Sequence, residues 1–344
     1  MAQPFDLAVV GAGPCGIATG IAAHAAGLTC VLFDKGCVVS SISGYPTWMK
    51  FFSTADRLEI GGVPFVVTGD KPTRREALRY YQRLAREFEL DVRQYEAVES
   101  VKRTRSRASA ATSPQDGLFE LATRTTVGVP HIYTAHNVVV ATGYFDSPNL
   151  LGIPGEDLPK VAHSYREGHE FYDQEVIVVG GGNSAVDAAL ELHHWGARVT
   201  LVHFADGLDP NVKPWVRPEI EARLREGDIQ SRFASRLIEV RPETALIEHA
   251  ASGAVEEVPN DWVLAMTGYM PDGALLRALG VSYDPESGIP HHDPDSMETN
   301  VTGVFIAGVL SAGFNANKVF IENGRGHGEL IAARVAAKQR PPLD

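Results

Sequence analysis

The sequence is poor in cysteine, in positive charge and in long apolar runs. Its three cysteines, at positions 15, 30 and 37, lack the repeating spacing of a metal site, so we predict none. Their odd number suits a reducing compartment, and we expect a cytoplasmic protein. The formal net charge of −12, without a basic stripe, argues against a nucleic-acid partner. No apolar run approaches the roughly 20 residues that span a bilayer, and the N-terminus lacks the basic segment of a signal peptide, so we expect no membrane association.

What the chain does contain is one informative repeat. Segments 5–34 (FDLAVVGAGPCGIATGIAAHAAGLTCVLFD) and 174–203 (QEVIVVGGGNSAVDAALELHHWGARVTLVH) each predict a strand, a glycine turn, a helix and a second strand. In both segments 16 residues separate the first glycine of the turn from the helix-ending glycine. In both, the second strand ends 23 residues after the first glycine. Two matched patterns indicate two nucleotide-binding βαβ units, where a single glycine motif would be weak evidence.

The two units differ at the end of the second strand, where nucleotide specificity is set. Asp34 ends the first unit, and its carboxylate can accept hydrogen bonds from ribose hydroxyls, which predicts FAD. His203 stands there in the second unit, so no carboxylate repels a 2′-phosphate, and Ala185 replaces the third glycine, which together predict NADPH. Cationic partners for the 2′-phosphate are expected from His203, Lys213 and Arg217. Lys213 and Arg217 are equally well explained as solvated surface charges.

Other segments fit one flavoprotein built around two nucleotides. The strand-ending turns in HNVVVATGYFDSP (136–148) and DWVLAMTGYMPD (261–272) bring the chain close to bound nucleotide. Near the C-terminus, ETNVTGVFIAGVLSAG (298–313) predicts a strand ending at Gly308, followed by one helical run over 317–337. A helix start there can stabilise negative charge on a reduced flavin. The order of motifs predicts that the NADPH domain, residues 161–269, is inserted into an FAD domain of residues 1–160 and 270–344.

The complete set of residues expected at the two nucleotides includes these segments and positions outside them. For FAD they are Gly11, Gly13, Pro14, Cys15, Gly16, Asp34, Lys35, Ser41, Tyr45, Thr47, Val98, Ala141, Thr142, Gly143, Gly308, Lys318 and Phe320. For NADPH they are Gly180, Gly182, Asn183, Ser184, Ala185, His203, Lys213 and Arg217.

Several stretches together resemble a known family. They are VVGAGPCG, SGYPTWMKFFSTADRLEIGGVPF, KPTRREALRYY, GGGNSAVDAALEL and NANKVFIENGRGHG, and the chain is similar to the YpdA-type bacillithiol disulfide reductases over nearly its whole length. The resemblance implies an α/β protein with two Rossmann-like domains in a thioredoxin-reductase-like arrangement. It also implies NADPH-dependent, FAD-mediated reduction of bacillithiol disulfide, and a homo-oligomer, either a dimer or a tetramer. The family commonly has Arg after the second-strand histidine, where this chain has Phe204.

The resemblance also implies that Cys15 is the redox residue. Neither C-x-x-C nor C-x-x-x-x-C occurs here, so a second cysteine that resolves a mixed disulfide is missing at those spacings. Cys15 lies at a predicted helix N-terminus, which is expected to lower the pKa of its thiol. In a one-cysteine cycle its thiolate attacks the substrate disulfide. The alternative is that Cys15 is a small filler of the turn, as Ser184 is in the second unit.

The remaining candidates have weaker patterns. Cys30 is expected in the core, and a Cys15–Cys37 pair is a minor alternative. Tyr45, Trp48 and Phe52 are expected either as an aromatic wall beside the flavin or as core. His163 and His327 are the candidate proton donors to departing thiolates, or structural histidines. Thr73 is expected to cap a helix over 73–89 that serves for packing, and residues 104–117 are expected to form an exposed loop.

Three other functions remain open. A flavin monooxygenase fits the segment between the nucleotide motifs, although the F-x-G-x-x-x-H-x-x-x-W/Y fingerprint is incomplete. A ferredoxin or flavodoxin reductase would have the same two nucleotides and a protein partner. A nucleotide sensor without enzymatic activity is disfavoured by the two paired loops.

Overall fold

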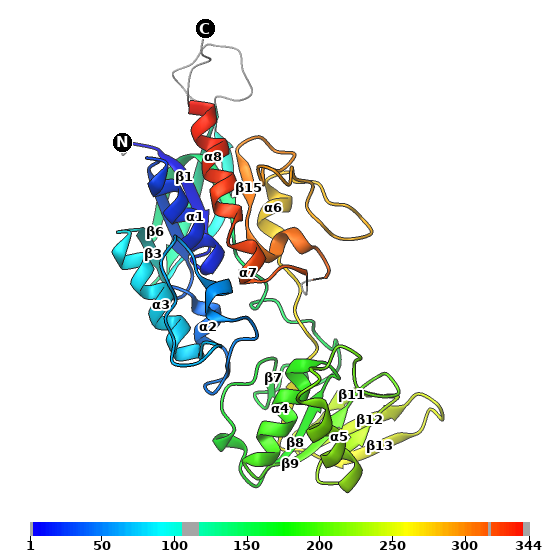
Figure 1. The fold of residues 1–344 in the computed structure, drawn as a ribbon. Coiled ribbons are helices and arrows are strands. Elements are labelled where there is room, and N and C mark those ends of the chain that lie inside the picture. The colour runs from blue at the N-terminus through cyan, green and yellow to red at the C-terminus, as the bar shows by residue number, and fades with distance from the viewer. Residues whose placement is uncertain (1–2, 105–116, 316–317, 340–344) are drawn as a thin grey trace. The chain divides into compact units, whose positions relative to one another are not determined.

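The chain forms two compact units. The computed structural model describes residues 3–104, 117–315 and 318–339, so residues 105–116 of the loop expected at 104–117 lie outside the described part. Unit 1 comprises Met1–Ser147 and Met270–Asp344, and unit 2 comprises Pro148–Tyr269 (Figure 1). Unit 2 is therefore inserted into the sequence of unit 1, and each is described here by itself.

The first boundary between the units lies at 147/148, earlier than the 160/161 boundary suggested by the sequence. Residues 148–160 belong with unit 2 because Leu151, Ile153 and Leu158 pack against its core. The Val240 amide also donates to the Pro154 carbonyl at 2.9 Å. The glycine motif alone could not reveal this packing of the preceding segment.

Unit 1 is built on a seven-stranded sheet of order β3-β2-β1-β6-β5-β4, with β15 pairing β6. Its elements are β1 (Phe5–Val10), α1 (Pro14–Ala25), β2 (Cys30–Asp34), α2 (Ser40–Ser43), η1 (Ala55–Leu58), α3 (Arg74–Glu87), β3 (Asp91–Gln94), β4 (Glu96–Thr104), β5 (Leu118–Thr125), β6 (Pro130–Val140), α6 (Ala274–Ala278), β15 (Val304–Ile306), η3 (Gly308–Ala312), α7 (Ile321–Gly324) and α8 (His327–Gln339). The second half of β6 pairs in parallel with β1 on one edge and with β15 on the other.

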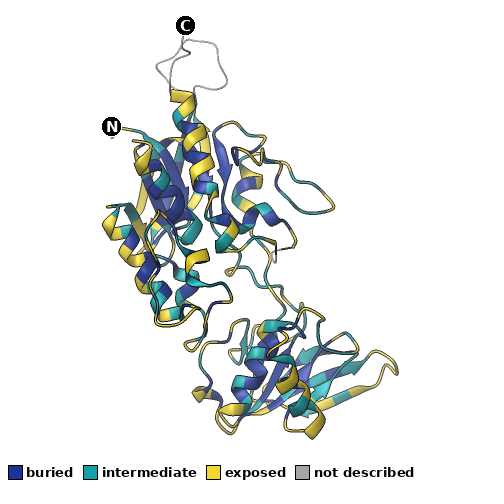
Figure 2. Cartoon of the chain, viewed as in Figure 1, coloured by how far each residue is buried: buried dark blue, intermediate teal, exposed yellow. Residues whose placement is uncertain are grey.

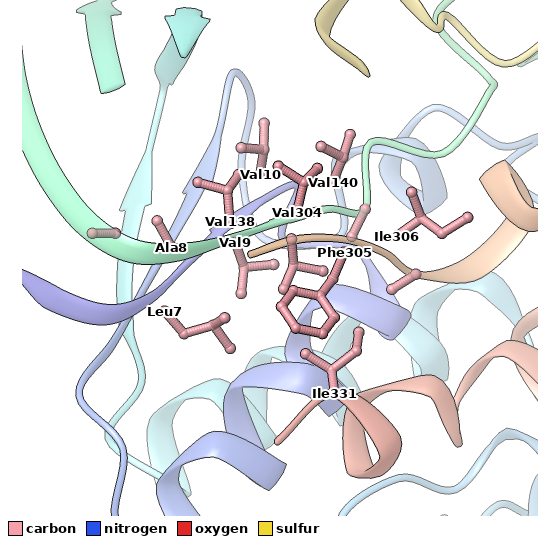
Figure 3. Close-up of a cluster of buried hydrophobic side chains, with 14 of the residues drawn as sticks. Leu7, Ala8, Val9, Val10, Val138, Val140, Val304, Phe305, Ile306 and Ile331 are labelled. Atoms are coloured by element: carbon pink, nitrogen blue, oxygen red, sulfur yellow. The ribbon is translucent and has the colours of Figure 1, made fainter. Parts of the chain in front are cut away.

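The core of unit 1 comes from these continuous apolar strands. Strands buried on both faces lack the polar alternation of a surface strand, and β1 and the last residues of β6, Val138–Val140, follow that rule. Figure 3 shows Phe305 of β15 next to Ile331 of α8, among strand residues such as Leu7 and Val138; all four are fully buried. Figure 2 shows that the central strands of each unit are buried, whereas the outward faces of the helices are exposed.

Unit 2 has a five-stranded parallel sheet of order β10-β9-β8-β14-β7 and a three-stranded antiparallel sheet of order β11-β12-β13. Its elements are β7 (Val161–Ala162), η2 (His169–Phe171), β8 (Glu175–Val179), α4 (Asn183–His194), β9 (Arg198–Val202), α5 (Arg217–Glu226), β10 (Gln230–Arg232), β11 (Ser235–Val240), β12 (Thr244–His249), β13 (Val255–Pro259) and β14 (Trp262–Ala265). The predicted strand–helix–strand repeat is confirmed in both units as β1-α1-β2 and β8-α4-β9.

Two local predictions have opposite outcomes. Thr73 caps α3 as expected: its hydroxyl accepts from the Glu76 amide at 3.2 Å, and the Glu76 carboxylate accepts from the Thr73 amide at 2.8 Å. The single helical run predicted over 317–337 is wrong, because α7 and α8 are separate helices. The break falls beside Gly324 and Gly326, residues of low helix propensity. Across the described residues, every helix is too short or too polar to cross a membrane.

Candidate functional site

The first glycine of each loop allows a close backbone approach. Gly11 has φ +110°, and a Cβ built there would lie 2.4 Å from the carbonyl oxygen of Ala141. Gly180 has φ +139°, and its Cβ would lie 2.5 Å from the carbonyl oxygen of Met266. Both positions therefore exclude a side chain. The Ala-Thr-Gly and Met-Thr-Gly turns thus meet the two glycine loops in the same way, which extends the repeat to a third element of each unit.

The second glycine of each loop faces open space. A Cβ at Gly13 or at Gly182 would have nothing within 4 Å. These glycines precede α1 and α4, and neither helix has a side-chain cap for its first amides. First-turn amides without a side-chain cap and the positive end of the helix dipole suit a pyrophosphate. The buried hydroxyl of Thr142, beside the first loop, also has no hydrogen-bond partner. These features fit a dinucleotide at each loop.

In unit 1 the carboxylate of Asp34 holds the glycine loop through hydrogen bonds. One carboxylate oxygen accepts from the Ala12 amide at 3.0 Å. The other accepts from the Gly36 amide at 2.8 Å and from the Ser40 hydroxyl at 3.0 Å. Each carboxylate oxygen has two lone-pair sites, so the group retains acceptor capacity for ribose hydroxyls. Asp34 is therefore both a clamp on the phosphate loop and a candidate ribose ligand.

The other residues expected at FAD differ in their contacts and in their exposure. Lys35 pairs with Asp146 at 3.1 Å, and the Tyr45 ring lies 4.9 Å from that of Phe145. Val98 packs against the hydrophobic core, so an FAD contact through its side chain is not evident. Ser41 is half-buried in α2; Thr47, Lys318 and Phe320 are exposed. Trp48 and Phe52 are also exposed, which excludes the core alternative for them.

Cys15 is not the activated thiol that its position predicts. A Cβ at Gly308 would lie 3.1 Å from its sulfur, and one at Gly324 would lie 2.9 Å away, so two glycine backbones cover the thiol. Burial raises the pKa of Cys15 to about 12, and the expectation of a lowered pKa is wrong. Desolvation of a thiolate outweighs the favourable helix end here. All three cysteines are free, so the Cys15–Cys37 pair is absent, and desolvation also raises the pKa of the Cys30 thiol to about 12.

The cations expected for a 2′-phosphate are already engaged. Lys213 is buried, with Nζ 2.6 Å from an Asp187 carboxylate oxygen. The guanidinium of Arg217 lies 3.1 Å from Glu221 and donates to the Asp209 carbonyl at 2.6 Å. The charges of both residues are therefore paired within the unit, and their role at a 2′-phosphate stays a prediction.

His203 is also not the expected cation. Its ring packs against the glycine loop, where a Cβ at Gly181 would lie 2.4 Å from it. Burial lowers the pKa of the imidazole, opposed by the Asp209 carboxylate, and the buried Nδ1 has no hydrogen-bond partner. The ring is therefore neutral at pH 7, and its shape fills the position that Asp34 takes in unit 1. Ser184, by contrast, is exposed in its loop.

The two candidate proton donors have structural contacts. The Nδ1 of His327 accepts from the Gly308 amide at 3.1 Å, which holds the turn over Cys15. Burial lowers the pKa of His327, so its neutral form is favoured, with the proton on Nε2. His163, in unit 2, has Nε2 3.6 Å from a Glu156 carboxylate oxygen.

Sequence patterns missed two contributors to this site. Gly324 has no motif of its own, yet its backbone covers Cys15. Arg325 donates to the carbonyls of Asp56 and Glu59, at 2.8 and 2.6 Å, and so ties the end of α7 to η1. The spacing of glycines in ENGRGHG was the available signal for a close approach.

Three comparisons with known proteins agree with this geometry. A family model for pyridine nucleotide-disulphide oxidoreductases matches residues 8–308. The chain is 43% identical over 331 residues to the bacilliredoxin reductase Bdr of Bacillus subtilis (strain 168), covering 96% of this chain and 97% of that protein. The solved bacillithiol disulfide reductase Bdr (YpdA) of Bacillus cereus is 42% identical, with TM-score 0.91, over 98% of this chain and 100% of that one. The Staphylococcus aureus structure of the same name is 37% identical, with TM-score 0.89 and the same coverage.

Proposed function

Since this chain belongs to the pyridine nucleotide-disulphide oxidoreductase family, we propose that it uses NADPH and FAD to reduce bacillithiol disulfide to two bacillithiol molecules. The observation that supports this most is the pair of matched loops, each with a first glycine closed by a strand-ending turn and a second glycine facing open space. The likeness to two reductases over nearly the whole chain supports the substrate.

We assign FAD to unit 1 and NADPH to unit 2. The amides at the start of α1 bind the FAD pyrophosphate, Asp34 positions the loop and accepts from ribose, and the Thr142 hydroxyl gains a partner. The amides at the start of α4 bind the NADPH pyrophosphate, and Asn183 and Ser184 lie at that helix start. FAD, when bound there, would supply the two-electron chemistry that links NADPH oxidation to disulfide reduction. With one proton from solvent, one disulfide yields two thiols and NADP⁺.

The redox role of Cys15 stays a prediction, and Cys15→Ser tests it. Loss of disulfide reduction, with NADPH-dependent bleaching of the flavin retained, would support a redox role for the sulfur. Retained turnover would make Cys15 a packing residue, which is the simpler account of a thiol covered by Gly308 and Gly324. The serine is the residue of the second loop at the same position, so it fits the turn.

The function is tested by anaerobic NADPH oxidation with bacillithiol, glutathione, coenzyme A and cystine disulfides. We expect turnover with bacillithiol disulfide and NADPH, and much less with the other disulfides or with NADH. Absence of turnover with every disulfide would overturn the proposal. Reduction of an iron–sulfur protein would then favour a ferredoxin reductase, and oxygen-dependent NADPH oxidation would favour a monooxygenase.

A protein disulfide is a second candidate substrate. The Bacillus subtilis relative is named for bacilliredoxin, a protein. Adding bacilliredoxin that carries a mixed disulfide with bacillithiol to the same assay separates the two substrates, because only a protein acceptor gives a rate that saturates with bacilliredoxin.

We also propose that the enzyme works in the cytoplasm as a homo-oligomer, a dimer or a tetramer. Sedimentation velocity at assay concentrations tests the assembly, and a purely monomeric boundary would contradict it.

A further inference from the structure

The edge of unit 2 that would hold the NADPH adenosine has an arginine which sequence motifs did not single out. In parallel α/β sheets, ligands bind outside the carboxyl ends of the strands. Strand β10 pairs in parallel with β9, so both strands end at the same edge as the glycine loop. After β10 the chain stays against the end of β9: the Ser235 amide donates to the His203 carbonyl at 3.0 Å, and the Ala234 amide to that of Ala205 at 2.8 Å. The next residue is Arg236.

The Arg236 side chain points toward the residue after His203. Its guanidinium carbon lies 5.3 Å from the centroid of the Phe204 ring, within cation–π distance. The Phe204 ring is tilted against the His203 ring, with centroids 4.5 Å apart. Phe204 is 63% exposed, so this stack of three side chains reaches the surface at the end of β9. The charge of Arg236 is thus held beside the position that distinguishes the two nucleotide units.

Arg236 also differs from its neighbours in having an unneutralised charge. Arg232 forms two hydrogen bonds with Glu256, and Arg241 pairs with Glu239. Glu248 is the register partner of Arg236 across β11 and β12, yet no carboxylate of the described residues lies within 4.0 Å of the Arg236 guanidinium. A paired guanidinium has less to offer a phosphate, whereas an exposed unpaired one supplies a planar, bidentate donor.

Two other arginines of unit 2 have no carboxylate partner among the described residues, and their places in the fold exclude them as ligands of the 2′-phosphate. Arg166 follows β7, which is separated from β9 by two strands of the sheet. Arg225 lies in the last turn of α5, ahead of β10, and therefore at the amino edge of the sheet. Lys213 and Arg217 are paired with Asp187 and Glu221, and the His203 ring packs against Gly181.

We propose that Arg236 binds the 2′-phosphate of NADPH and sets the preference for NADPH over NADH. The inference rests on the proposed NADPH-dependent function. Phe204 orients the guanidinium by stacking. Because position 203 carries no carboxylate, no negative charge there repels the 2′-phosphate. Arg236 is therefore a specificity residue, away from the reacting end of the nucleotide.

The test measures binding rather than turnover. Isothermal titration calorimetry on the full-length holoenzyme compares adenosine 2′,5′-bisphosphate with 5′-AMP, which differ only in the 2′-phosphate. Because hydrogen bonds to a charged group contribute about 1.5–3 kcal/mol, Arg236→Met is expected to weaken bisphosphate binding about 10- to 100-fold while 5′-AMP binding is unchanged. Arg236→Lys keeps the positive charge but not the planar, bidentate guanidinium, and it is expected to lose less affinity for the bisphosphate than Arg236→Met. Arg241→Met, one residue beyond the end of β11 and paired with Glu239, is the matched control and is expected to keep the wild-type preference.

The outcomes separate this inference from the proposed function. If the wild-type enzyme prefers the bisphosphate and Arg236→Met keeps that preference, Arg236 is not the specificity residue and the proposed function stands. If the wild-type enzyme binds both nucleotides alike, the choice of NADPH fails, and the role of Arg236 with it. If Arg236→Met loses both nucleotides, Arg236→Lys decides: a retained preference for the bisphosphate supports the inference, and an equal loss of both overturns it.

Discussion

The loops at Gly11 and at Gly180 have the same backbone plan but different side chains around it. Each first glycine packs against the carbonyl before a Thr-Gly turn, and each second glycine faces open space. In unit 1 the Asp34 carboxylate accepts from the amide of Ala12. In unit 2 the neutral ring of His203 packs on the corresponding residue, Gly181. The two loops therefore share a glycine-determined backbone shape and differ in the charge of the residue 23 positions after the first glycine, a carboxylate in unit 1 and a neutral imidazole in unit 2.

The fifth and sixth positions of the loops differ as well. Cys15 is covered by Gly308 and Gly324, whereas Ser184 at the matching position is exposed. A Cβ at Gly16 would lie 1.9 Å from the Gly11 carbonyl oxygen, yet unit 2 accommodates Ala185 at this place, fully buried. The first loop is thus the more tightly enclosed of the two.

The largest expected difference is in thiol reactivity. With its pKa raised from 9.0 to about 12, Cys15 has roughly a thousandfold less thiolate at pH 7 than an ordinary cysteine. We expect iodoacetamide labelling of Cys15 in the native enzyme to be slower by that factor, as measured by peptide mass spectrometry. Ser184→Cys is the matched control, because its exposed thiol at a helix start is expected to react at least as fast as an ordinary one. Equal labelling of both positions would contradict the burial of Cys15.

The next largest effect is expected at the third glycine. Gly16→Ala forces a methyl group onto the Gly11 carbonyl, which we expect to cost roughly 3 kcal/mol of folding free energy and to abolish FAD retention. The reverse change in unit 2, Ala185→Gly, is expected to cost about 1 kcal/mol and to leave FAD bound. Flavin absorbance after gel filtration and thermal melting measure both. If Gly16→Ala retained FAD and melted at the wild-type temperature, the first loop would not be more tightly enclosed than the second.

A smaller effect is expected when the carboxylate of unit 1 is transferred to unit 2. His203→Asp is expected to accept from the Gly181 amide, as Asp34 does from Ala12, and to repel the 2′-phosphate. The ratio of kcat/KM for NADPH to that for NADH is expected to fall about tenfold. His203→Asn has a similar shape without the charge and is the control. An unchanged ratio in His203→Asp would show that position 203 does not face the phosphate.

The smallest expected effect is on acid stability. Because burial lowers the pKa of His203 in the folded state, the unfolded chain takes up a proton there first as pH falls. The folding free energy from this group is fully present above the ordinary histidine pKa of about 6.5 and is lost as pH falls through the lower folded value. His203→Gln is expected to have a flatter urea stability profile between pH 7 and pH 5. A steeper profile in the variant would contradict the prediction that folding lowers the pKa of His203.

Local chemistry was predictable from the sequence, and long-range enclosure was not. The repeated strand–turn–helix segments, the place of Asp34 at a strand end and the capping residue Thr73 all follow from short patterns. The burial of Cys15 depends on Gly308 and Gly324, residues about 300 positions away, and no local pattern predicts that they pack against Cys15. The helix-end argument for a reactive thiol therefore lacked its larger opposing effect, desolvation.

Charge pairing was hidden for the same reason. Lys213 follows the second nucleotide motif at a spacing that suits a phosphate, but Asp187 lies on the neighbouring helix α4 and neutralises it. Arg236 belongs to a segment without a motif and comes to the strand end only through the pairing of β10 with β9. The spacing of residues within one element can be read from the sequence. Which carboxylate pairs with a given cation depends on how the elements pack.

The insertion of unit 2 has a consequence for how the protein is made. Strand β15, which covers the Val138–Val140 edge of β6, and helix α8 follow unit 2 in the chain and are therefore synthesised after it. At roughly 5–20 residues per second, residues 270–344 follow several seconds after unit 2 has been synthesised. During that interval the nascent FAD unit has an open sheet edge and no turn at Gly308. We therefore expect a chain stalled at residue 269 to bind no flavin, because it lacks β15 and the turn at Gly308 that packs on Cys15.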